Sequence, residues 1–371
     1  MLLSIKTSKY VNAITDSYKN IINEFSGKSD TIAIVPGVYD ESEFLKDFRV
    51  LIRENFSKHN KVTALLLAVK LAVKIRQLVK IHQVDKIFIY HENDWFNIFL
   101  YTSMIGLKVK YYIWMHDPVL HSGEGSITKA VKFVNSKFVY KSSKLEKIFI
   151  SYRDIKDFVS TYYRIEKTRI VPIKLPEIRE MEFEDIRNIE SGLSHYRYDV
   201  IFFGRIEEYK GVELFIDSID YLKKKYGLRL KGLIAGTGRI ESLISQKING
   251  SENISFINKY LSNRELAELI AESRVVVLPY KDATGSITVQ VANYYNKPVV
   301  ASRVGCFPEY VENGTNGLLI NEYSEAGLAE KIYELFSNEA LYRNIKKQIG
   351  SYFKENFDIK EVVKKLENEI E

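Results

Sequence analysis

The sequence contains one cysteine, and that scarcity excludes several kinds of site. Because Cys306 is the only cysteine among 371 residues, neither an intramolecular disulfide nor a metal site built from cysteines can form. A chain without disulfides is expected in a reducing compartment, so we predict a cytoplasmic location. The first residues also lack the basic start, long apolar stretch and small-residue cleavage site of a signal peptide, and secretion is not expected.

Long apolar runs and one acidic metal-binding motif are also missing. The most apolar helix-like stretch, Val62 to Val79, includes Lys70, Lys74 and Arg76, so it is not expected to span a membrane. No Asp-x-Asp motif occurs in the chain. Its absence argues against a nucleotide-sugar enzyme that holds its diphosphate through a metal ion, and we predict no metal site.

Two glycine motifs for nucleotides are incomplete. Gly236-Thr237-Gly238 lacks the third glycine of a dinucleotide fingerprint, because Glu241 stands in its place, and a nicotinamide enzyme is therefore disfavoured. The segment Ser26 to Ser29 imitates the end of a phosphate-binding P-loop. Ile22 occupies the position of the earlier glycine, so we exclude a P-loop.

What the sequence does contain is an alternation of strand-like and helix-like segments over a length suited to two domains. This alternation predicts an α/β protein with doubly wound parallel sheets. The predicted strands are Leu2 to Lys6, Thr31 to Pro36, Lys86 to Tyr90, Lys108 to Trp114, Lys147 to Ile150, Tyr198 to Gly204, Arg229 to Gly236, Asn253 to Asn258, Val275 to Pro279 and Pro298 to Ser302. We interpret Val171 to Arg197, which has no clear period, as the connection between the domains, and expect three helices after Asn321.

Positive charge is concentrated in the first half of the chain. There are 28 Lys and Arg against 17 Asp and Glu through Pro176, while the whole chain carries +6. One explanation is a solvated lysine-rich surface, and the other is a face toward anionic lipid or an anionic acceptor. The helix predicted over Lys61 to His82 combines an apolar stripe with a basic side, which fits either a peripheral membrane contact or a packed core helix. No nucleic-acid partner is expected.

The strongest local signal follows the strand that ends at Gly204. Arg205 comes directly after this glycine, and Lys210 stands just before Gly211 and a helical pattern. Two cations at the carboxyl end of one strand suit a diphosphate, because Arg can contact two oxygens and Lys adds a point charge. The alternative is that both are surface charges paired with the neighbouring Glu207 and Glu208.

Three further segments offer ligand contacts at strand ends. Gly236 and Gly238 would let the backbone approach a ligand closely. Thr284-Gly285-Ser286, followed by Ile287, offers backbone N–H groups at a helix start, either for an anion or for ordinary N-capping by Thr284 or Ser286. His116 and Asp117 end a strand of the first half, where a ligand contact and a structural role are both open.

In this order the motifs resemble those of retaining glycosyltransferases of the GT-B fold, and within them the large family 4, or glycosyl transferases group 1. The resemblance is specific from Tyr198 to Asn321, and only His116 to Pro118 with His121 to Glu124 resembles the family in the first half. The motifs that carry it are Gly-Arg-x4-Lys-Gly at 204–211, Gly-x-Gly at 236–238, Pro-Tyr-x-x-Ala-Thr-x-Ser at 279–286, Lys-Pro-Val-Val at 297–300, and Gly-x-x-Pro-Glu at 305–309 followed by Glu-Asn-Gly-x-x-Gly at 312–317.

The resemblance implies two Rossmann-like domains facing a cleft. Residues 1–176 would bind the acceptor and residues 177–358 the nucleotide-sugar donor, while a final helix over about 359–371 would pack back on the first domain. It also implies that Arg205 and Lys210 neutralise the donor diphosphate without a metal and that His116 lies by the donor sugar. The donor would be a UDP- or GDP-sugar, no further cofactor is expected, and transfer would retain the anomeric configuration.

Two departures from the family pattern stand out. The usual Glu-x7-Glu pair falls on Ala283 and Val291, while Asp282 and Gln290 keep the same spacing one residue earlier. One residue turns a helical side chain by about 100°, so replacement of the ribose-binding carboxylate needs a local shift. The family's glycine-rich turn after the first strand is also absent, because Lys6 to Tyr10 stands there.

The leading expectation is therefore a retaining, metal-independent glycosyltransferase that extends a surface glycan on a glycan or lipid-linked acceptor, cytoplasmic and peripheral to the membrane. The loss of the Glu pair keeps a second hypothesis open, in which a catalytically silent GT-B protein binds glycan or accompanies an active transferase. A GT-B isomerase that acts on a nucleotide sugar ranks below both, because neither half shows a paired general acid and base.

Overall fold

The computed structural model describes residues 1–7, 13–44, 47–54, 61–90, 95–116, 118, 130, 133–134, 137, 139–191, 195–249, 251–283 and 285–371. The chain divides into two compact units. The first consists of Met1–Pro176 together with the C-terminal segment Ile359–Glu371, and the second consists of Glu177–Asp358. Among the described helices, none combines the length and the apolar character that crossing a membrane would require.

The first unit is built on a seven-stranded parallel sheet in the order β3-β2-β1-β4-β5-β6-β7. Its strands are β1 (Leu2–Ile5), β2 (Thr31–Val35), β3 (Val50–Arg53), β4 (Lys86–Tyr90), β5 (Lys110–Met115), β6 (Leu145–Ile150) and β7 (Ile170–Pro172). The order runs outward in both directions from β1 and β4, which is the arrangement of a Rossmann-like sheet.

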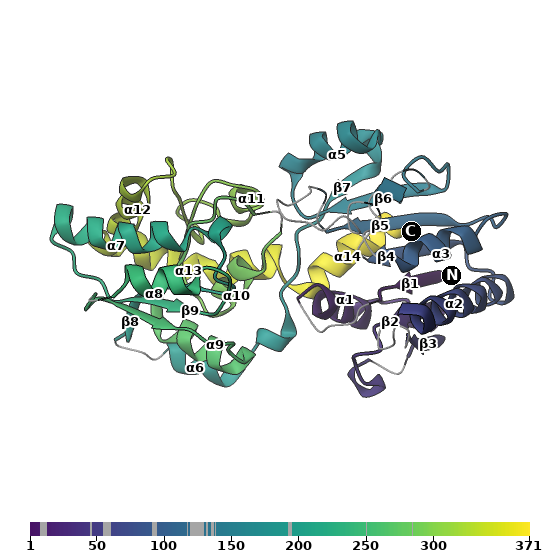
Figure 1. Cartoon of the computed structure of the whole chain (residues 1–371), viewed down its shortest axis with the longest axis horizontal. Coiled ribbons are helices and arrows are strands. Elements are labelled where there is room, and N and C mark those ends of the chain that lie inside the picture. Colours follow the sequence, from purple (N-terminus) through teal and green to yellow (C-terminus); the bar gives the residue numbers. More distant parts are fainter. Residues whose placement is uncertain are drawn as a thin grey trace. The chain divides into compact units, whose positions relative to one another are not determined.

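Helices cover both faces of this sheet. They are α1 (Ala13–Glu24), α2 (Lys61–Ile81), α3 (Phe96–Ser103), α5 (Lys156–Tyr163) and α14 (Ile359–Ile370), with 3-10 turns η1 (Lys28–Asp30), η2 (Glu41–Glu43), η4 (Arg153–Ile155) and η5 (Lys167–Arg169). The N-terminal α1 and the C-terminal α14 pack together on the sheet, where Tyr18 and Leu366 join Phe88 and Trp114 in one buried cluster (Figure 1). Alternate residues of β4 and β5 point into this cluster, as the two-residue period of a strand requires.

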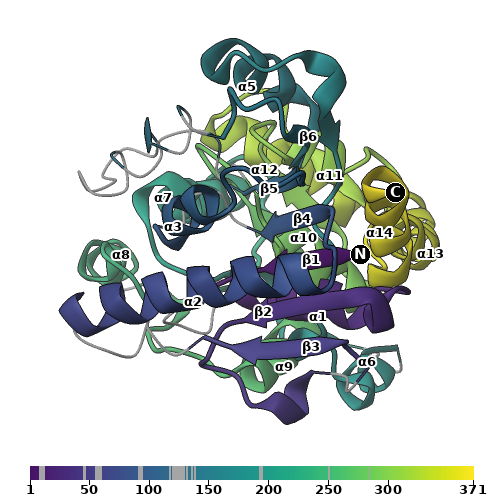
Figure 2. The same ribbon diagram turned by 90° about the vertical axis from the view of Figure 1, so that its right-hand side faces the viewer.

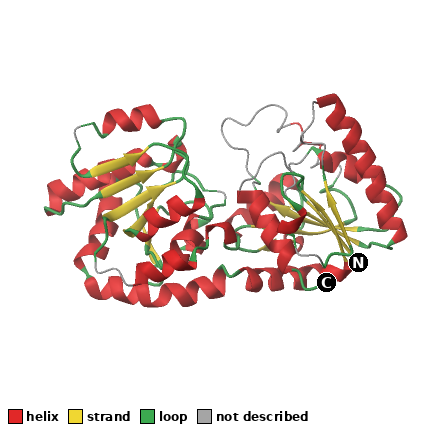
Figure 3. Ribbon diagram, turned by 90° about the horizontal axis from the view of Figure 1, so that it is seen from below, coloured by secondary structure: helices red, strands yellow, loops and turns green. Residues whose placement is uncertain are grey.

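The second unit contains a six-stranded parallel sheet in the order β10-β9-β8-β11-β12-β13, which is again Rossmann-like. The strands are β8 (Tyr198–Phe203), β9 (Gly232–Ala235), β10 (Ile254–Ile257), β11 (Ser273–Leu278), β12 (Val299–Ala301) and β13 (Gly317–Leu319). The helices are α6 (Glu184–Ser191), α7 (Val212–Tyr226), α8 (Glu241–Lys247), α9 (Asn263–Ala271), α10 (Thr288–Tyr294), α11 (Phe307–Tyr310), α12 (Glu325–Ser337) and α13 (Glu339–Asn356), with η6 (Arg179–Met181) and η7 (Glu208–Lys210). Figure 3 shows strands layered between helices in each unit.

The predicted fold class, an α/β protein with two doubly wound parallel sheets, is confirmed. Three short strands were not predicted: β3, β7 and β13. The stretch Val171 to Arg197, interpreted as the connection between the domains, contains most of β7 and all of α6, which its lack of a clear period did not predict. Pro172 in β7 and the glycine that opens β13 weaken the strand pattern, and both strands lie at sheet edges, where a proline is tolerated.

A capping box fixes the start of α9. The Oγ of Ser262 accepts from the amide of Glu265 at 3.2 Å, and the Glu265 carboxylate accepts from the amide of Ser262 at 2.8 Å. The ammonium of Lys259 donates to the same carboxylate at 2.7 Å. The hydrogen bond from Lys259, followed by those from Ser262, lowers the pKa of Glu265 to about 2.

The carboxyl ends of the strands in the second unit meet along one edge of its sheet. Beyond the strand ends, the amide of Gly204 donates to the carbonyl of Ala235 at 3.0 Å, and the amide of Gly236 donates to that of Ile257 at 3.0 Å. On the other side of β8, the amide of Ser302 donates to the carbonyl of Leu278 at 3.1 Å. This edge therefore gathers the glycine, lysine and proline motifs, and it is where ligands bind in doubly wound sheets.

Candidate functional site

Glycines bring the ends of β8 and β9 into backbone contact. Gly204 has φ +112° and Gly236 has φ +143°, backbone conformations that residues other than glycine rarely adopt. A Cβ on Gly236 would lie 1.9 Å from the carbonyl oxygen of Gly204, and one on Gly238 would lie 2.2 Å from that of Ile206. Both predicted glycines of the Gly-x-Gly motif thus serve the approach of two strand ends to each other.

The two predicted cations lie at the end of β8 without acidic partners among the described residues. Arg205 is exposed and Lys210 is half-buried in the turn η7. Their neighbours pair elsewhere: the Glu207 carboxylate lies 3.8 Å from the guanidinium of Arg239, and that of Glu208 lies 3.7 Å from the ammonium of Lys281. The alternative that Glu207 and Glu208 neutralise Arg205 and Lys210 is therefore wrong in this structure.

Lys210 is held over the loop by an aromatic ring. Its Nζ lies 5.0 Å from the ring centroid of Tyr280 and 3.1 Å from the point where a Cβ on Gly204 would stand. Tyr280 is 2% exposed, and its hydroxyl is buried without a hydrogen-bond partner among the described residues. The ring attracts the ammonium without neutralising its charge, so Lys210 stays available to an anion.

Gly211 joins this turn to the end of β11. It has φ +67°, and a Cβ there would lie 1.8 Å from the carbonyl oxygen of Pro279. That carbonyl also accepts a hydrogen bond from the hydroxyl of Tyr323 at 3.1 Å. Next along the chain, the amide of Lys281 donates to the carbonyl of Tyr209 at 2.6 Å. The turn with Lys210 and the loop after β11 are therefore fixed to one another.

At the start of α10, some backbone N–H groups are bonded within the loop and others are not. The Oγ of Ser286 lies 2.7 Å from Oγ1 of Thr288 and accepts from the Thr288 amide at 3.3 Å. The amides of Gly285 and Ile287 donate to no described residue. The hydroxyl of Ser286 therefore accepts from the first amide of α10, although the N-cap residue is Ile287, and within the described part of this loop two N–H groups remain for a ligand. The predicted contact Thr284 lies outside the described residues.

The lone cysteine lies beneath this loop. Cys306 is fully buried, and its amide donates to the carbonyl of Ala283 at 3.1 Å. Burial raises the pKa of the Cys306 thiol to about 12, against a smaller lowering by hydrogen bonds from backbone amides, that of Ser286 first. A Cβ on the preceding Gly305 would lie 1.6 Å from the Ala283 carbonyl oxygen, so the loop and this turn are in backbone contact.

The two residues that keep the family's carboxylate spacing differ in accessibility. Asp282 is exposed, whereas Gln290 is fully buried within α10. Ala283 and Val291, which occupy the family's glutamate positions, are both buried apolar residues. Of the two predicted substitutes for the ribose-binding carboxylate, only Asp282 can meet a ligand without a rearrangement of α10.

His116 belongs to the first unit, whereas the other predicted site residues belong to the second. It follows directly after β5 and is half-buried. The neighbouring Asp117 and the segment 121–125 lie outside the described residues. The structure thus brings together Gly204, Arg205, Lys210 and the loop after β11, and it shows His116 only at the end of its own strand.

Sequence reasoning missed the two aromatic residues of the site. Tyr280 contacts the ring of Phe307 at a centroid distance of 5.1 Å and that of Tyr209 at 6.3 Å, besides lying under Lys210. Burial, and then the nearby Glu213 carboxylate, raise the pKa of Tyr323 to about 12. In the sequence Tyr280 was visible only as the second residue of the Pro-Tyr-x-x-Ala-Thr-x-Ser motif, without a role of its own, and nothing pointed to Tyr323.

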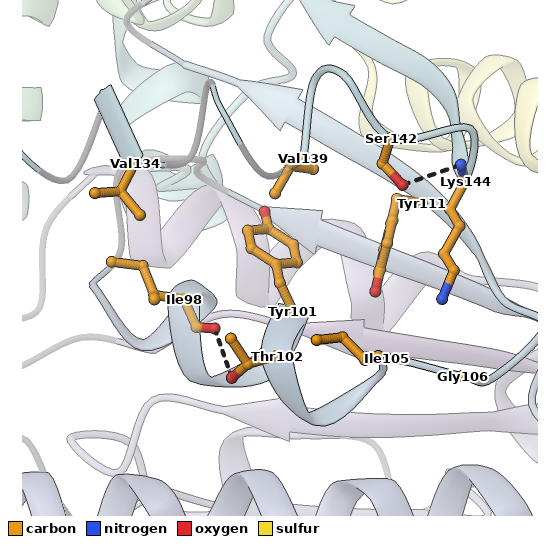
Figure 4. Close-up of a pocket in the computed structure, with 10 residues that line it drawn as sticks. All are labelled: Ile98, Tyr101, Thr102, Ile105, Gly106, Tyr111, Val134, Val139, Ser142 and Lys144. Atoms are coloured by element: carbon orange, nitrogen blue, oxygen red, sulfur yellow. Dashed lines mark hydrogen bonds between the residues drawn. The ribbon is translucent and has the colours of Figure 1, made fainter.

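An apolar cavity of about 290 Å³ lies in the first unit (Figure 4). Its walls come from α3 and from the amino ends of β5 and β6, and they include Ile98, Tyr101, Tyr111 and Lys144. Because ligands of doubly wound sheets bind at the carboxyl ends of strands, this cavity is at the wrong edge for the predicted chemistry. The described residues that line it form no polar cluster comparable to the end of β8.

Comparisons with known proteins agree with the fold and with the motifs of the second unit. Residues 185–351 match the family model described as Glycosyl transferases group 1. An uncharacterized glycosyltransferase of Methanocaldococcus jannaschii is 28% identical over 42% of this chain and 43% of its own length. An uncharacterized 41.2 kDa protein in the cps region of Klebsiella pneumoniae is 22% identical over 75% of this chain and 77% of its own. The chain thus spans less than half of the first of these relatives.

Solved structures share the fold over the whole chain. The Anabaena protein HepE, solved in complex with UDP, superposes with a TM-score of 0.73 at 14% identity and covers 99% of this chain and 98% of its own. WaaG, a glycosyltransferase involved in lipopolysaccharide biosynthesis, superposes with a TM-score of 0.67 at 13% identity, covering 100% and 99%. Together these matches support a glycosyltransferase: residues 185–351 match the glycosyl transferases group 1 family model, and the chain has the GT-B fold.

Proposed function

We propose that this chain is a retaining, metal-independent glycosyltransferase that uses a UDP- or GDP-sugar as donor. The observation that carries the proposal is the pair Arg205 and Lys210 at the carboxyl end of β8, neither of which pairs with a described carboxylate. Two cations beside glycine backbone suit a diphosphate, whose oxygens they contact directly. The complex of HepE with UDP supports a nucleotide ligand for the same fold.

The chemistry asked of these residues is stabilisation of a leaving group. When the bond between the anomeric carbon and the phosphate oxygen breaks, its electron pair goes to the diphosphate. Arg205 and Lys210 would stabilise that charge, and the N–H groups of Gly285 and Ile287 would add two donors. Because two side-chain cations supply this stabilisation, the proposed reaction proceeds without a metal ion. The acceptor hydroxyl would attack on the face that the diphosphate leaves and give its proton to the departing phosphate oxygen, so that the configuration is retained.

The proposed roles of the two units follow the family resemblance. The second unit would bind the donor, with Gly204, Gly236 and Gly238 shaping the loops at its sheet edge. The first unit would bind the acceptor, and His116 would contact the transferred sugar. Asp282, as the exposed carboxylate in the loop after β11, is the proposed contact for the ribose.

We further propose that the acceptor is a glycan or a lipid-linked glycan in surface polysaccharide synthesis, and that the chain acts in the cytoplasm. Two names support this assignment: WaaG is described as involved in lipopolysaccharide biosynthesis, and the Klebsiella relative as a protein in the cps region.

A nucleotide-release assay tests the proposal. The protein is incubated with a panel of UDP- and GDP-sugars in EDTA, and release of UDP or GDP is followed for wild type, Lys210→Ala and the exposed control Lys224→Ala on α7. Wild type and the control should release one nucleotide, and Lys210→Ala should be strongly impaired. Nucleotide binding without release under any donor and acceptor would favour the catalytically silent alternative, which the buried apolar residues Ala283 and Val291 keep in view.

A further inference from the structure

The helix α2 of the first unit carries a set of apolar side chains on the outside. Its outward apolar residues are between 42% and 71% exposed and comprise Val62, Leu65, Leu66, Val69, Val73 and Ile81. The side that packs against the unit consists of Ala64, Ala68, Ala72, Ile75 and Val79, and Leu67, Leu71 and Leu78 beside them are half-buried. A helix that only covers a sheet has polar residues on its outer side, so the exposed apolar residues need another explanation. Figure 2 shows α2 lying along the outside of the first unit's strands.

These outward residues form a continuous stripe with lysines beside it. Val62, Leu66, Val69 and Val73 are spaced three or four residues apart, so they lie one above the other on a single side of α2. Lys70 and Lys74 are exposed on the flank of the stripe, and Lys80 is exposed near the C-terminal end of the helix. We call this surface, from Val62 to Ile81, the α2 face. No acidic residue occurs in α2.

A hydrogen-bond contact adds one more apolar side chain beside the α2 face. The guanidinium of Arg76 donates to the carbonyl of Ser103 and, at 2.9 Å, to that of Ile105. These bonds hold the turn after α3 against α2, and Ile105 in that turn is 68% exposed. The exposed apolar surface therefore extends from α2 onto the turn after α3.

Charge decides what could cover this surface. A second copy of the chain would bring the lysines of two α2 faces together, with no acidic residue in either helix to compensate. An anionic bilayer can cover the apolar stripe and neutralise the lysines at once. Apolar side chains enter the boundary between headgroups and acyl chains, while the lysine side chains reach the lipid phosphates. The excess of 28 basic over 17 acidic residues through Pro176 favours the same partner.

We propose that the α2 face docks the first unit on the surface of a bilayer that contains anionic lipids. The stripe from Val62 to Val73 lies in the interfacial region, and Lys70, Lys74 and Lys80 contact lipid phosphates. This contact is independent of nucleotide binding and of the proposed transfer reaction, so the failure of either proposal leaves the other intact.

Co-sedimentation with vesicles tests the proposal. The full chain is mixed with vesicles of phosphatidylcholine alone or of equal parts phosphatidylcholine and phosphatidylglycerol, over a range of salt. Lys70→Glu with Lys74→Glu removes charge from the flank, and Leu66→Gln with Val69→Gln and Val73→Gln removes the stripe. All five positions are exposed and both replacements form helices well, so melting curves should stay close to wild type.

Matched controls come from exposed positions elsewhere in the chain. Lys223→Glu with Lys224→Glu on α7 makes the same change in net charge, and Phe158→Gln with Tyr162→Gln on α5 removes exposed apolar side chains. Both controls should bind anionic vesicles like wild type. The lysine variant of α2 should bind at least about 25-fold more weakly at low salt. The stripe variant should lose the binding that persists when salt is raised.

Three results would overturn the proposal. Wild type could fail to bind anionic vesicles, or the two α2 variants could bind as well as their controls. Sedimentation equilibrium could also reveal a wild-type dimer that the stripe variant disperses, in which case a second copy covers the α2 face.

Discussion

Replacing Lys210 by Met separates the role of its charge from the role of its stem. The methionine keeps the length and the apolar contact with the Tyr280 ring, which lies 5.0 Å from Nζ, but it removes the ammonium. Hydrogen bonds to a charged group contribute roughly 1.5–3 kcal/mol, so UDP or GDP should bind roughly 10- to 150-fold more weakly. The free energy of unfolding should change by no more than the cation–π contribution, about 0.5–1 kcal/mol.

Isothermal titration calorimetry with UDP and GDP measures the loss, and urea unfolding measures the stability. Uridine and guanosine serve as ligands without phosphate, and their affinities should be the same for wild type and Lys210→Met. Lys281→Met is the matched protein control, because that ammonium is 3.7 Å from the Glu208 carboxylate and is not assigned to the diphosphate. Diphosphate affinity retained by Lys210→Met within about threefold, or an equal loss for the nucleosides, would refute the assignment.

Three further outcomes follow from the second unit. Gly236→Ala should lower the free energy of unfolding in urea by about 2–4 kcal/mol, because its Cβ would lie 1.9 Å from a carbonyl oxygen and the backbone has φ +143°. The control Gly350→Ala, which has open space around it in α13, should raise the free energy of unfolding by about 1 kcal/mol. Equal effects of the two substitutions would contradict the packing argument. The fully buried Cys306, whose pKa is about 12, should not react with Ellman's reagent at pH 8 until the protein is unfolded, and reaction in the native state at the rate of a free thiol would show that the burial is wrong. The pKa of Glu265 falls from 4.5 to about 2 on folding, so its stabilisation of the α9 start is complete above pH 4.5 and is lost as the pH falls toward 2. Melting curves of Glu265→Gln should therefore differ most from wild type near neutral pH and converge with it in acid, and a difference that persists at pH 2 would exclude this origin.

The sequence predicted the parts of the fold that long, continuous patterns specify. The predicted strand Lys86 to Tyr90 has the same bounds as β4, and the helix predicted over Lys61 to His82 ends one residue earlier in the structure. The short edge strands β3, β7 and β13 were not predicted, because an alternating pattern over three or four residues is too short to distinguish a strand from a loop. Edge strands are specified by pairing with a neighbour that the sequence does not reveal.

For the candidate site, spacing identified the cations but not their surroundings. Arg205 and Lys210 were found from their place around a strand end, and their alternative pairing with Glu207 and Glu208 could be decided only from the positions of Arg239 and Lys281. The contact of Lys210 with the Tyr280 ring depends on β8 and β11 lying side by side, which is a tertiary fact. In the same way, the sequence showed an apolar stripe on α2 but not that the stripe faces outward.

The position of a bound diphosphate tests the central claim most directly. A crystal structure of the chain with UDP or GDP should place the phosphate oxygens within hydrogen-bonding distance of Arg205 and Lys210, beside the amides of Gly285 and Ile287. Phosphates bound at another edge of either sheet, or a nucleotide that leaves both Arg205 and Lys210 without contact, would contradict the account.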